Sequence, residues 1–185
     1  MALTTLFPLL LATLASAAPT AAGDGPKTCK QITLSAMNWI AMGFHYRSQV
    51  IFSTPSHQID AGNVEFTLTN TAIDYVMQCA AASSQPIDFF YGDQWFDCTG
   101  PAGSKAAFQY DKAGGKLSVK QDWSCQDDPS DVQFHGEGTV VFSLNCTVTD
   151  WKNPDWTQGE LYSTEMTDCS PLDLVIEPQT LTGVA

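Results

Sequence analysis

Six cysteines are the feature that most limits what this chain can fold into. They are Cys29, Cys79, Cys98, Cys125, Cys146 and Cys169. An even number of cysteines in an exported chain predicts disulfide bonds, because the export route is oxidising and no thiol has to remain free. We therefore expect three disulfides, and we interpret Cys98, which follows the aromatic pair Trp95-Phe96, as a structural cysteine instead of a nucleophile or a metal ligand.

The N-terminal residues indicate that the chain is exported. A short apolar run is followed by the small residues Ala15-Ser16-Ala17, a pattern typical of a secretory signal peptide, which we assign to residues 1–17. The run is too short to span a bilayer as a helix, which takes about 20 residues. Residues 18–28 are predicted to form a flexible arm and residues 29–185 a single domain. The predicted location is extracellular.

The charge of the chain limits its partners. It has 20 acidic and 8 basic residues, a formal net charge of −12. Such a surface repels phosphate backbones and anionic lipids, so nucleic-acid binding and membrane binding are not expected. A basic protein, by contrast, would be attracted.

The dominant hydrophobic period of the chain is two residues. Apolar and polar residues alternate in Val64–Thr69 and again in Thr139–Cys146, and a glycine-bearing loop joins Phe108–Tyr110 to Lys116–Trp123 as a hairpin. The other expected strands are Ile32–Met42, Gln49–Phe52, Phe89–Cys98, Val132–Phe134, Leu161–Met166 and Leu172–Ile176. Ala72–Ser84 fits both helical spacing and strand alternation, and we favour a strand. This pattern predicts an all-β fold: an antiparallel β-barrel or closed sandwich stapled by disulfides.

Sequence separation favours one set of cysteine pairs without excluding the others. The shortest separations pair Cys79 with Cys98 and Cys125 with Cys146. Each bond would close a loop of about 20 residues and contribute roughly 3 kcal/mol in the chain-entropy model. The remaining pair, Cys29 with Cys169, would join the two ends of the domain.

Aromatic residues and cysteines follow a particular order between residues 29 and 148. The order is Trp39-Ile40, Phe44, Val64-Glu-Phe-Thr-Leu68, Cys79, Trp95-Phe-x-Cys98, Leu117-Ser-Val-x-Gln-x-Trp-x-Cys125 and Cys146. It resembles that of the secreted fungal β-barrel family named after the major Alternaria allergen.

The resemblance implies a compact antiparallel barrel in which Cys79, Cys98, Cys125 and Cys146 form two internal disulfides. It also implies export by a fungus and a role as an allergen, or as an effector or elicitor that meets plant-defence proteins, with small phenolic molecules as proposed ligands. Members of the family have no well-defined catalytic site.

The resemblance also bears on the oligomeric state. In the allergen a cysteine near the place of Cys29 links two protomers. This chain departs from the pattern, because an extension from about residue 149 adds Cys169. A Cys29–Cys169 bond would give a monomer, and a homodimer is the alternative.

Histidines, cysteines and acidic residues do not form a convincing catalytic or metal-binding pattern. His45, His57 and His135 lack an accompanying nucleophile motif and are expected on the surface or at strand ends. No histidine pair has metal-ligand spacing, so neither a metal nor a cofactor is expected. The acidic residues from Asp122 to Asp131 match no calcium loop known to us, and we interpret them as a solvated loop.

A glycoside hydrolase needs two carboxylates across a cleft, and three glutamates could supply them: Glu65, Glu137 and Glu160. Glu137 stands between Gly136 and Gly138, which suggests an exposed turn or bulge. Solvent-facing glutamates are common in secreted β proteins, so this is the least favoured function.

The five tryptophans divide into two groups. Trp39, Trp95 and Trp123 lie in expected strands or beside cysteines and are expected in the core. Trp151 and Trp156 lie in a polar stretch with proline and glycine, predicted to be a loop. Exposed rings there could stack on a sugar or bind a hydrophobic partner; alternatively, they fold back over one end of the barrel.

One glycosylation sequon, Asn145-Cys-Thr147, is present, and the strand parity points Asn145 outward. Either state of this site, glycosylated or free, is compatible with the sequence.

The expected function is that of a secreted, non-enzymatic, allergen-like effector or elicitor that binds a host protein or a small phenolic ligand. The alternative is a carbohydrate-binding module that uses Trp151 and Trp156.

Overall fold

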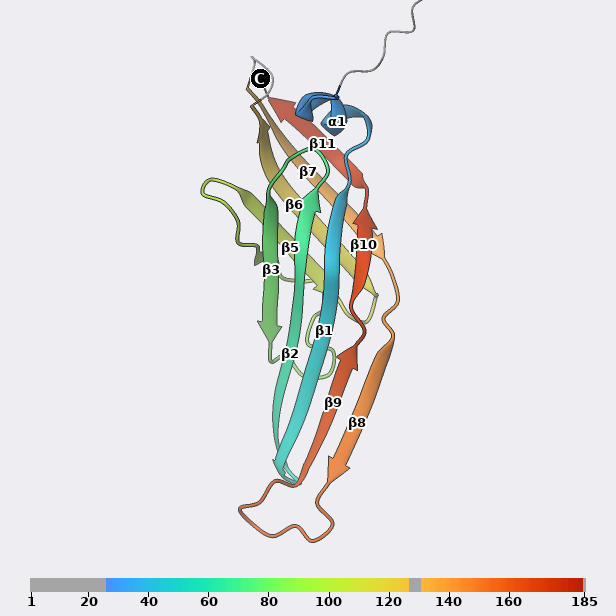
Figure 1. Ribbon diagram of the computed structural model, residues 1–185. Coiled ribbons are helices and arrows are strands. Elements are labelled where there is room, and N and C mark those ends of the chain that lie inside the picture. Colours follow the sequence, from blue (N-terminus) through green and yellow to red (C-terminus); the bar gives the residue numbers. More distant parts are fainter. Residues whose placement is uncertain (1–25, 127–130, 185) are drawn as a thin grey trace, which may run out of the picture.

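The computed structural model describes residues 26–126 and 131–184 (Figure 1). The predicted signal peptide and most of the predicted arm lie outside these residues. The elements are α1 (Cys29–Ser35), β1 (Trp39–Thr54), β2 (His57–Asn70), β3 (Val76–Ser83), β4 (Phe96–Asp97), β5 (Lys105–Asp111), β6 (Lys116–Cys125), β7 (Val132–Val141), β8 (Cys146–Lys152), β9 (Ser163–Cys169), β10 (Leu172–Ile176) and β11 (Pro178–Val184).

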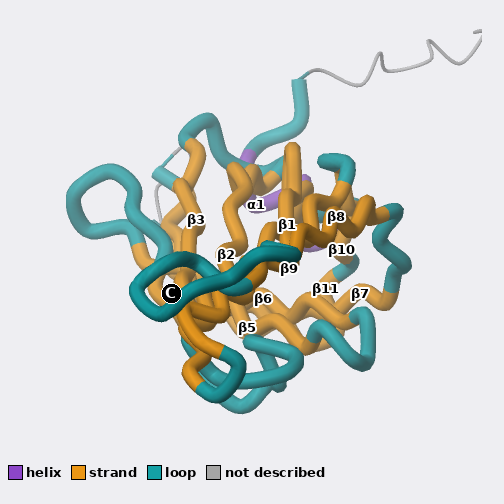
Figure 2. The backbone as a smooth tube through the Cα atoms, turned by 90° about the horizontal axis from the view of Figure 1, so that it is seen from below, coloured by secondary structure: helices purple, strands orange, loops and turns teal. Residues whose placement is uncertain are grey.

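The strands form two antiparallel sheets that lie face to face. The first has the order β3-β2-β1-β9-β8, with β10 also paired to β1, and the second has the order β11-β7-β6-β5-β4. The end-on view shows the two layers (Figure 2). The predicted all-β, antiparallel class is confirmed. A closed barrel is not found among the described strands, although an isolated bridge between Gln78 and Thr99 joins the sheets along one side.

Strand β1 is much longer than the alternation of the sequence suggested. It continues through Gly43, whose φ of 64° lies in the left-handed region that glycine adopts without strain, and the register with β2 shifts there. The half of β1 up to Tyr46 is mostly buried against the second sheet, whereas residues 47–54 are exposed or half-buried. With residues 57–61, 146–152 and 163–168 they form the part that we call the projecting sheet, which extends past the second sheet (Figure 1).

The core is centred on Trp39, which is fully buried. Its indole Nε1 donates to Gln121 Oε1 at 2.8 Å, and its ring meets Trp123 edge to face at 6.1 Å between centroids. Gly136 and Gly138 of β7 face this ring, and a Cβ at Gly136 would lie 3.0 Å from it. The expectation of a turn at Glu137 is therefore wrong: the two glycines occupy a regular strand and leave room for tryptophan.

The disulfides confirm one expected pair and contradict two. Cys79 bonds to Cys98 as predicted, but Cys29 bonds to Cys125 and Cys146 bonds to Cys169. Cys146 and Cys169 stand directly opposite each other on β8 and β9. Short sequence separation misled the prediction, because strand pairing brings these two residues together and takes Cys146 away from Cys125.

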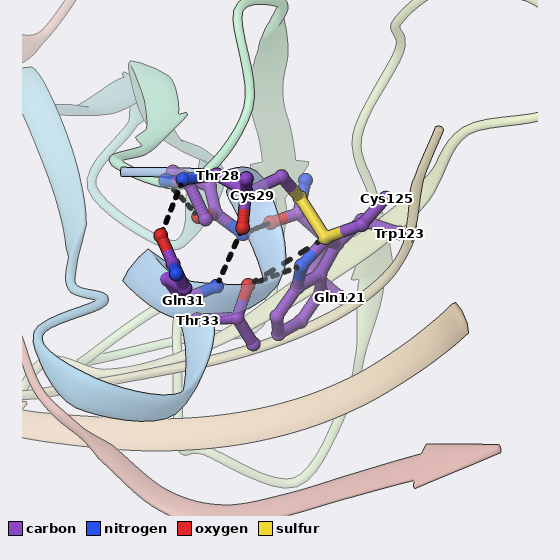
Figure 3. The surroundings of a disulfide bond; sticks show 9 residues. Thr28, Cys29, Gln31, Thr33, Gln121, Trp123 and Cys125 are labelled. Carbon is purple, nitrogen blue, oxygen red and sulfur yellow. Dashed lines mark hydrogen bonds between the residues drawn. A yellow bond between two sulfur atoms is a disulfide. The ribbon is translucent and has the colours of Figure 1, made fainter. Parts of the chain in front are cut away.

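The Cys29–Cys125 bond attaches α1 to the end of β6 (Figure 3). Thr28 and Gln31 form a capping box at the start of this helix, and Trp123 Nε1 donates to Thr33 Oγ1 at 3.2 Å. The strand expected over Ile32–Met42 is thus wrong in its first half. With Cys29 bonded within the chain, all six cysteines, each of them in the described part, are paired.

Two other stretches differ from the expectation. Phe89–Cys98, expected as a strand, contains only the two-residue β4. The segment after residue 149 is part of both sheets, since β9 and β10 pair with β1 and β11 pairs with β7. In the described residues, no helix has the length and apolar character needed to cross a membrane.

Replacing Gly136 by alanine tests the packing of Trp39. The new methyl group would lie within 3.2 Å of ring atoms of both Trp39 and Trp123, so we expect a loss of about 1–3 kcal/mol in the free energy of unfolding. Urea denaturation measures it. Gln133→Ala, at an exposed position of the same strand, should change stability by less than about 0.5 kcal/mol. Equal effects of the two substitutions would contradict this account of the glycine.

Replacing Cys29 and Cys125 together by serine tests the bond between α1 and β6. The bond spans a sequence separation of 96 residues, and its loss should lower the free energy of unfolding by about 4–5 kcal/mol in the chain-entropy model. Thermal unfolding measures it. The same double replacement of Cys79 and Cys98, separated by 19 residues, should cost less, about 3 kcal/mol. The reverse order would contradict the pairing.

Candidate functional site

The two tryptophans proposed as binding residues do not lie on one loop. Trp151 belongs to β8 and is 47% exposed. Trp156 lies in the following loop, half-buried, where its Nε1 donates to the Glu160 carbonyl at 2.8 Å and its ring meets Tyr162 edge to face. The prediction that both tryptophans lie in one loop is therefore wrong for Trp151. Trp151 is the more accessible of the two.

One face of the projecting sheet carries several exposed apolar side chains. The strand registers place Ile59, Ile51, Thr164 and Trp151 in one row across β2, β1, β9 and β8. Met166 lies two residues from Thr164 along β9 and therefore on the same face. Ile59 is 54% exposed and Met166 is 49% exposed. Neighbouring exposed apolar side chains on a sheet are typical of an interaction surface. We call the four apolar residues of this group, Ile59, Ile51, Trp151 and Met166, the apolar row.

The opposite face of the projecting sheet carries three carboxylates in one row. Its central row contains Asp60, Val50, Glu165 and Asp150, in that order across the strands. Asp150 and Glu165 are direct cross-strand partners, an arrangement of like charges that destabilises a sheet. One carboxylate oxygen of Asp60, Oδ1, is buried without a hydrogen-bond partner. We call the three carboxylates the acidic row; a cationic partner would relieve their repulsion.

The outer face of the second sheet carries another group of polar residues. Trp95 was expected in the core, but it is 37% exposed, and Lys120 Nζ lies 4.3 Å from its ring centroid. The expectation failed because the next residue, Phe96, packs against Phe90 and Phe108 in the core, so Trp95 faces the other side of the sheet. Lys120 and Glu137 are direct cross-strand partners on this face.

His135 lies between two carboxylates on the same face. Its Nδ1 is 2.6 Å from Asp122 Oδ1 and its Nε2 is 3.4 Å from Glu137 Oε1. The hydrogen bond with Asp122 raises the pKa of His135 above its usual range, and Glu137 adds to this, while partial burial acts in the opposite direction. The two carboxylates therefore favour the protonated form of His135.

The three glutamates considered for hydrolysis are not brought together. Glu137 is on β7, whereas Glu65 is on β2, where it contacts Arg47 Nη2 at 3.2 Å. Glu160 lies in the loop before β9 and accepts from the Thr157 backbone N–H. A pair of these glutamates across one cleft is therefore not formed.

The other residues singled out in the sequence lie apart from these surfaces. Asn145 is exposed in the segment between β7 and β8. His57 contacts Ser53, and His45 pairs with Asp168 at 2.7 Å. Within residues 26–126 and 131–184, His, Cys, Asp and Glu form no group of three or more suited to hold a metal ion. Part of the acidic stretch before Asp131 lies outside the described residues.

Both candidate surfaces were missed in the sequence for the same reason. The members of the acidic row and of the His135 group come from different strands, and only the register between strands makes them neighbours. Alternation did indicate that His135 faces solvent, which is confirmed.

Comparison with protein families gives a match over most of the chain. The model described as Alternaria alternata allergen 1 matches residues 42–169, a range that runs from β1 to β9. Searches of the curated proteins and of the solved structures found no match.

The His135 group can be tested by titration. We expect the NMR titration midpoint of His135 to lie above 6.5, and Asp122→Asn to lower it, because the substitution removes the strongest hydrogen bond to the imidazolium. Since the folded-state pKa is raised, protonated His135 stabilises the fold fully below its unfolded-state pKa. This contribution is lost as the pH rises through the folded-state value. Asp150→Asn, on the other sheet, should leave the midpoint unchanged; an equal shift would refute the assignment.

Proposed function

The chain belongs to the Alternaria alternata allergen 1 family, and from this premise we propose that it is a secreted, non-enzymatic protein that binds a basic host protein through the projecting sheet. In this proposal it acts as an effector or elicitor outside the cell. Three disulfides support an oxidising, extracellular location.

The observation that carries the proposal is the acidic row. Asp150 and Glu165 face each other directly across β8 and β9, and Asp60 lies in the same row. A sheet that keeps like charges opposed loses stability unless something compensates them. A lysine- or arginine-rich surface would do so, and the net charge of −12 would steer it toward the molecule.

The apolar row supplies a second kind of contact on the other face. Trp151 and Met166 are about half exposed there, and a large aromatic ring is a common anchor in protein interfaces. A partner that clasps the projecting sheet would use both faces. Because β8 is the edge strand, such a partner could also reach from one face to the other around it.

Charge reversal tests the proposal. The immobilised mature protein is incubated with plant extracellular fluid, and bound proteins are identified with and without the double substitution Asp150→Lys and Glu165→Lys. We expect the wild type to retain a specific basic protein whose recovery falls at least about tenfold with the double variant, since two favourable charge contacts become repulsive.

Glu177→Lys is the matched control, because it changes an exposed carboxylate between β10 and β11, outside the projecting sheet. This control should retain the partner. Trp151→Ala should weaken binding as well. Retention of the same partner by the double variant, or its loss with the control, would refute the proposed surface.

A further inference from the structure

The outer face of the second sheet carries two adjacent polar rows. One consists of Asp97, Ala107, Lys120, Glu137 and Thr180, and the other of Lys105, Asp122, His135 and Thr182. Every member is placed by the register of β4, β5, β6, β7 and β11. The two rows thus cross the whole sheet on its solvent side.

A groove runs over these rows. Its central hollow, of about 570 Å³, lies over β5, β6 and β7. A smaller hollow of about 170 Å³ continues from Glu137 to Trp95, and a third continues from His135 toward Tyr75. The second hollow shares Glu137 with the central one, and the third shares Lys105, Asp122 and His135 with it, so the three hollows adjoin one another. We call the three adjoining hollows the groove. From Ser118 to Ser124 along β6 they extend together over about 20 Å at the rise of a β-strand.

The floor and one wall of the groove have distinct chemistry. Ala107 lies between Asp97 and Lys120 in the first row and is only 4% exposed, so its short side chain forms the floor of the central hollow. Trp95 lines one end and is 37% exposed, with the Lys120 ammonium over one face of its ring. An exposed ring beside hydrogen-bonding groups offers a stacking face to a ligand that is both apolar and polar.

The charges of the groove exclude several classes of ligand. Asp97, Asp122 and Glu137 would repel an anion such as a phosphate. Lys105 and Lys120 would repel a cation. A purely apolar ligand would leave all of these groups desolvated without partners. Dense donors and acceptors that carry charges of both signs suit a neutral molecule with many hydroxyl groups.

We propose that this groove binds a neutral oligosaccharide segment, with Trp95 stacking on one sugar ring and Lys120, His135 and Glu137 hydrogen bonding to hydroxyl groups. The length of the groove favours a chain of several sugars over a monosaccharide. The groove and the projecting sheet are on different sheets, so the two proposals can fail separately.

The test is a titration of the ¹⁵N-labelled mature protein with cellohexaose, xylohexaose and laminarihexaose, followed by amide chemical shifts. At least one of these neutral hexasaccharides should give saturable shifts at Lys105, Lys120, His135 and Glu137, with half-saturation below about 1 mM. Trp95→Ala should weaken this binding at least about fivefold. Ala107→Leu should abolish it, because the larger side chain fills the floor of the groove.

Trp151→Ala is the control, since it removes an exposed ring from the projecting sheet and should leave the affinity unchanged. Hexagalacturonate, the anionic counterpart, should bind more weakly than the neutral sugar. The proposal is overturned if none of the three neutral sugars binds, or if hexagalacturonate binds more tightly. It is also overturned if Trp95→Ala leaves the affinity as it was or Trp151→Ala abolishes binding. The spectrum of each variant reports whether it is folded, and Trp95→Ala decides the question if Ala107→Leu does not fold.

Discussion

Strand β1 is the constraint on which the rest of the structure depends. Its 16 residues pair with β2 along one edge and with β10 and then β9 along the other. The first half packs Trp39, Phe44 and Tyr46 against the second sheet, where all three side chains are fully buried. The second half continues past that sheet. One uninterrupted strand therefore connects a stable core to a surface that is free to make contacts.

Much of the fold could be predicted from the sequence, because alternation reports local burial. The strands around Val64–Thr69 and Lys116–Trp123 and the antiparallel all-β class were accessible in this way. The Cys79–Cys98 pair was indicated instead by its short sequence separation. The other two disulfides were not. Cys125 and Cys146 are close in sequence, but β7 returns along β6 before β8 joins the other sheet, and only the topology contains that information.

The candidate surfaces were less predictable than the fold for a related reason. Glycines at 136 and 138 suggested a turn that would expose Glu137, yet they serve the packing of Trp39 from the inner side of the strand. Glu137 is exposed because its side chain points to the solvent side of β7. Lys120 is its neighbour through the pairing of β6 with β7, and His135 is its neighbour because it lies two residues away on the same face of β7. A sequence records which residues face solvent more readily than which of them are neighbours across strands.

The position of the Cys146–Cys169 bond has a consequence for local motion. It joins β8 to β9 one residue beyond the Arg47–Asp168 pair, at the end of the projecting sheet nearest the fully buried Tyr46 and Val64. Fraying that starts at the free tip of the edge strand can therefore open β8 only as far as this covalent link. Amide hydrogens on the core side of the Cys146–Cys169 bond exchange only through larger openings of the fold. The projecting sheet should therefore be less protected against hydrogen exchange and proteolysis than the core, with this bond as the boundary.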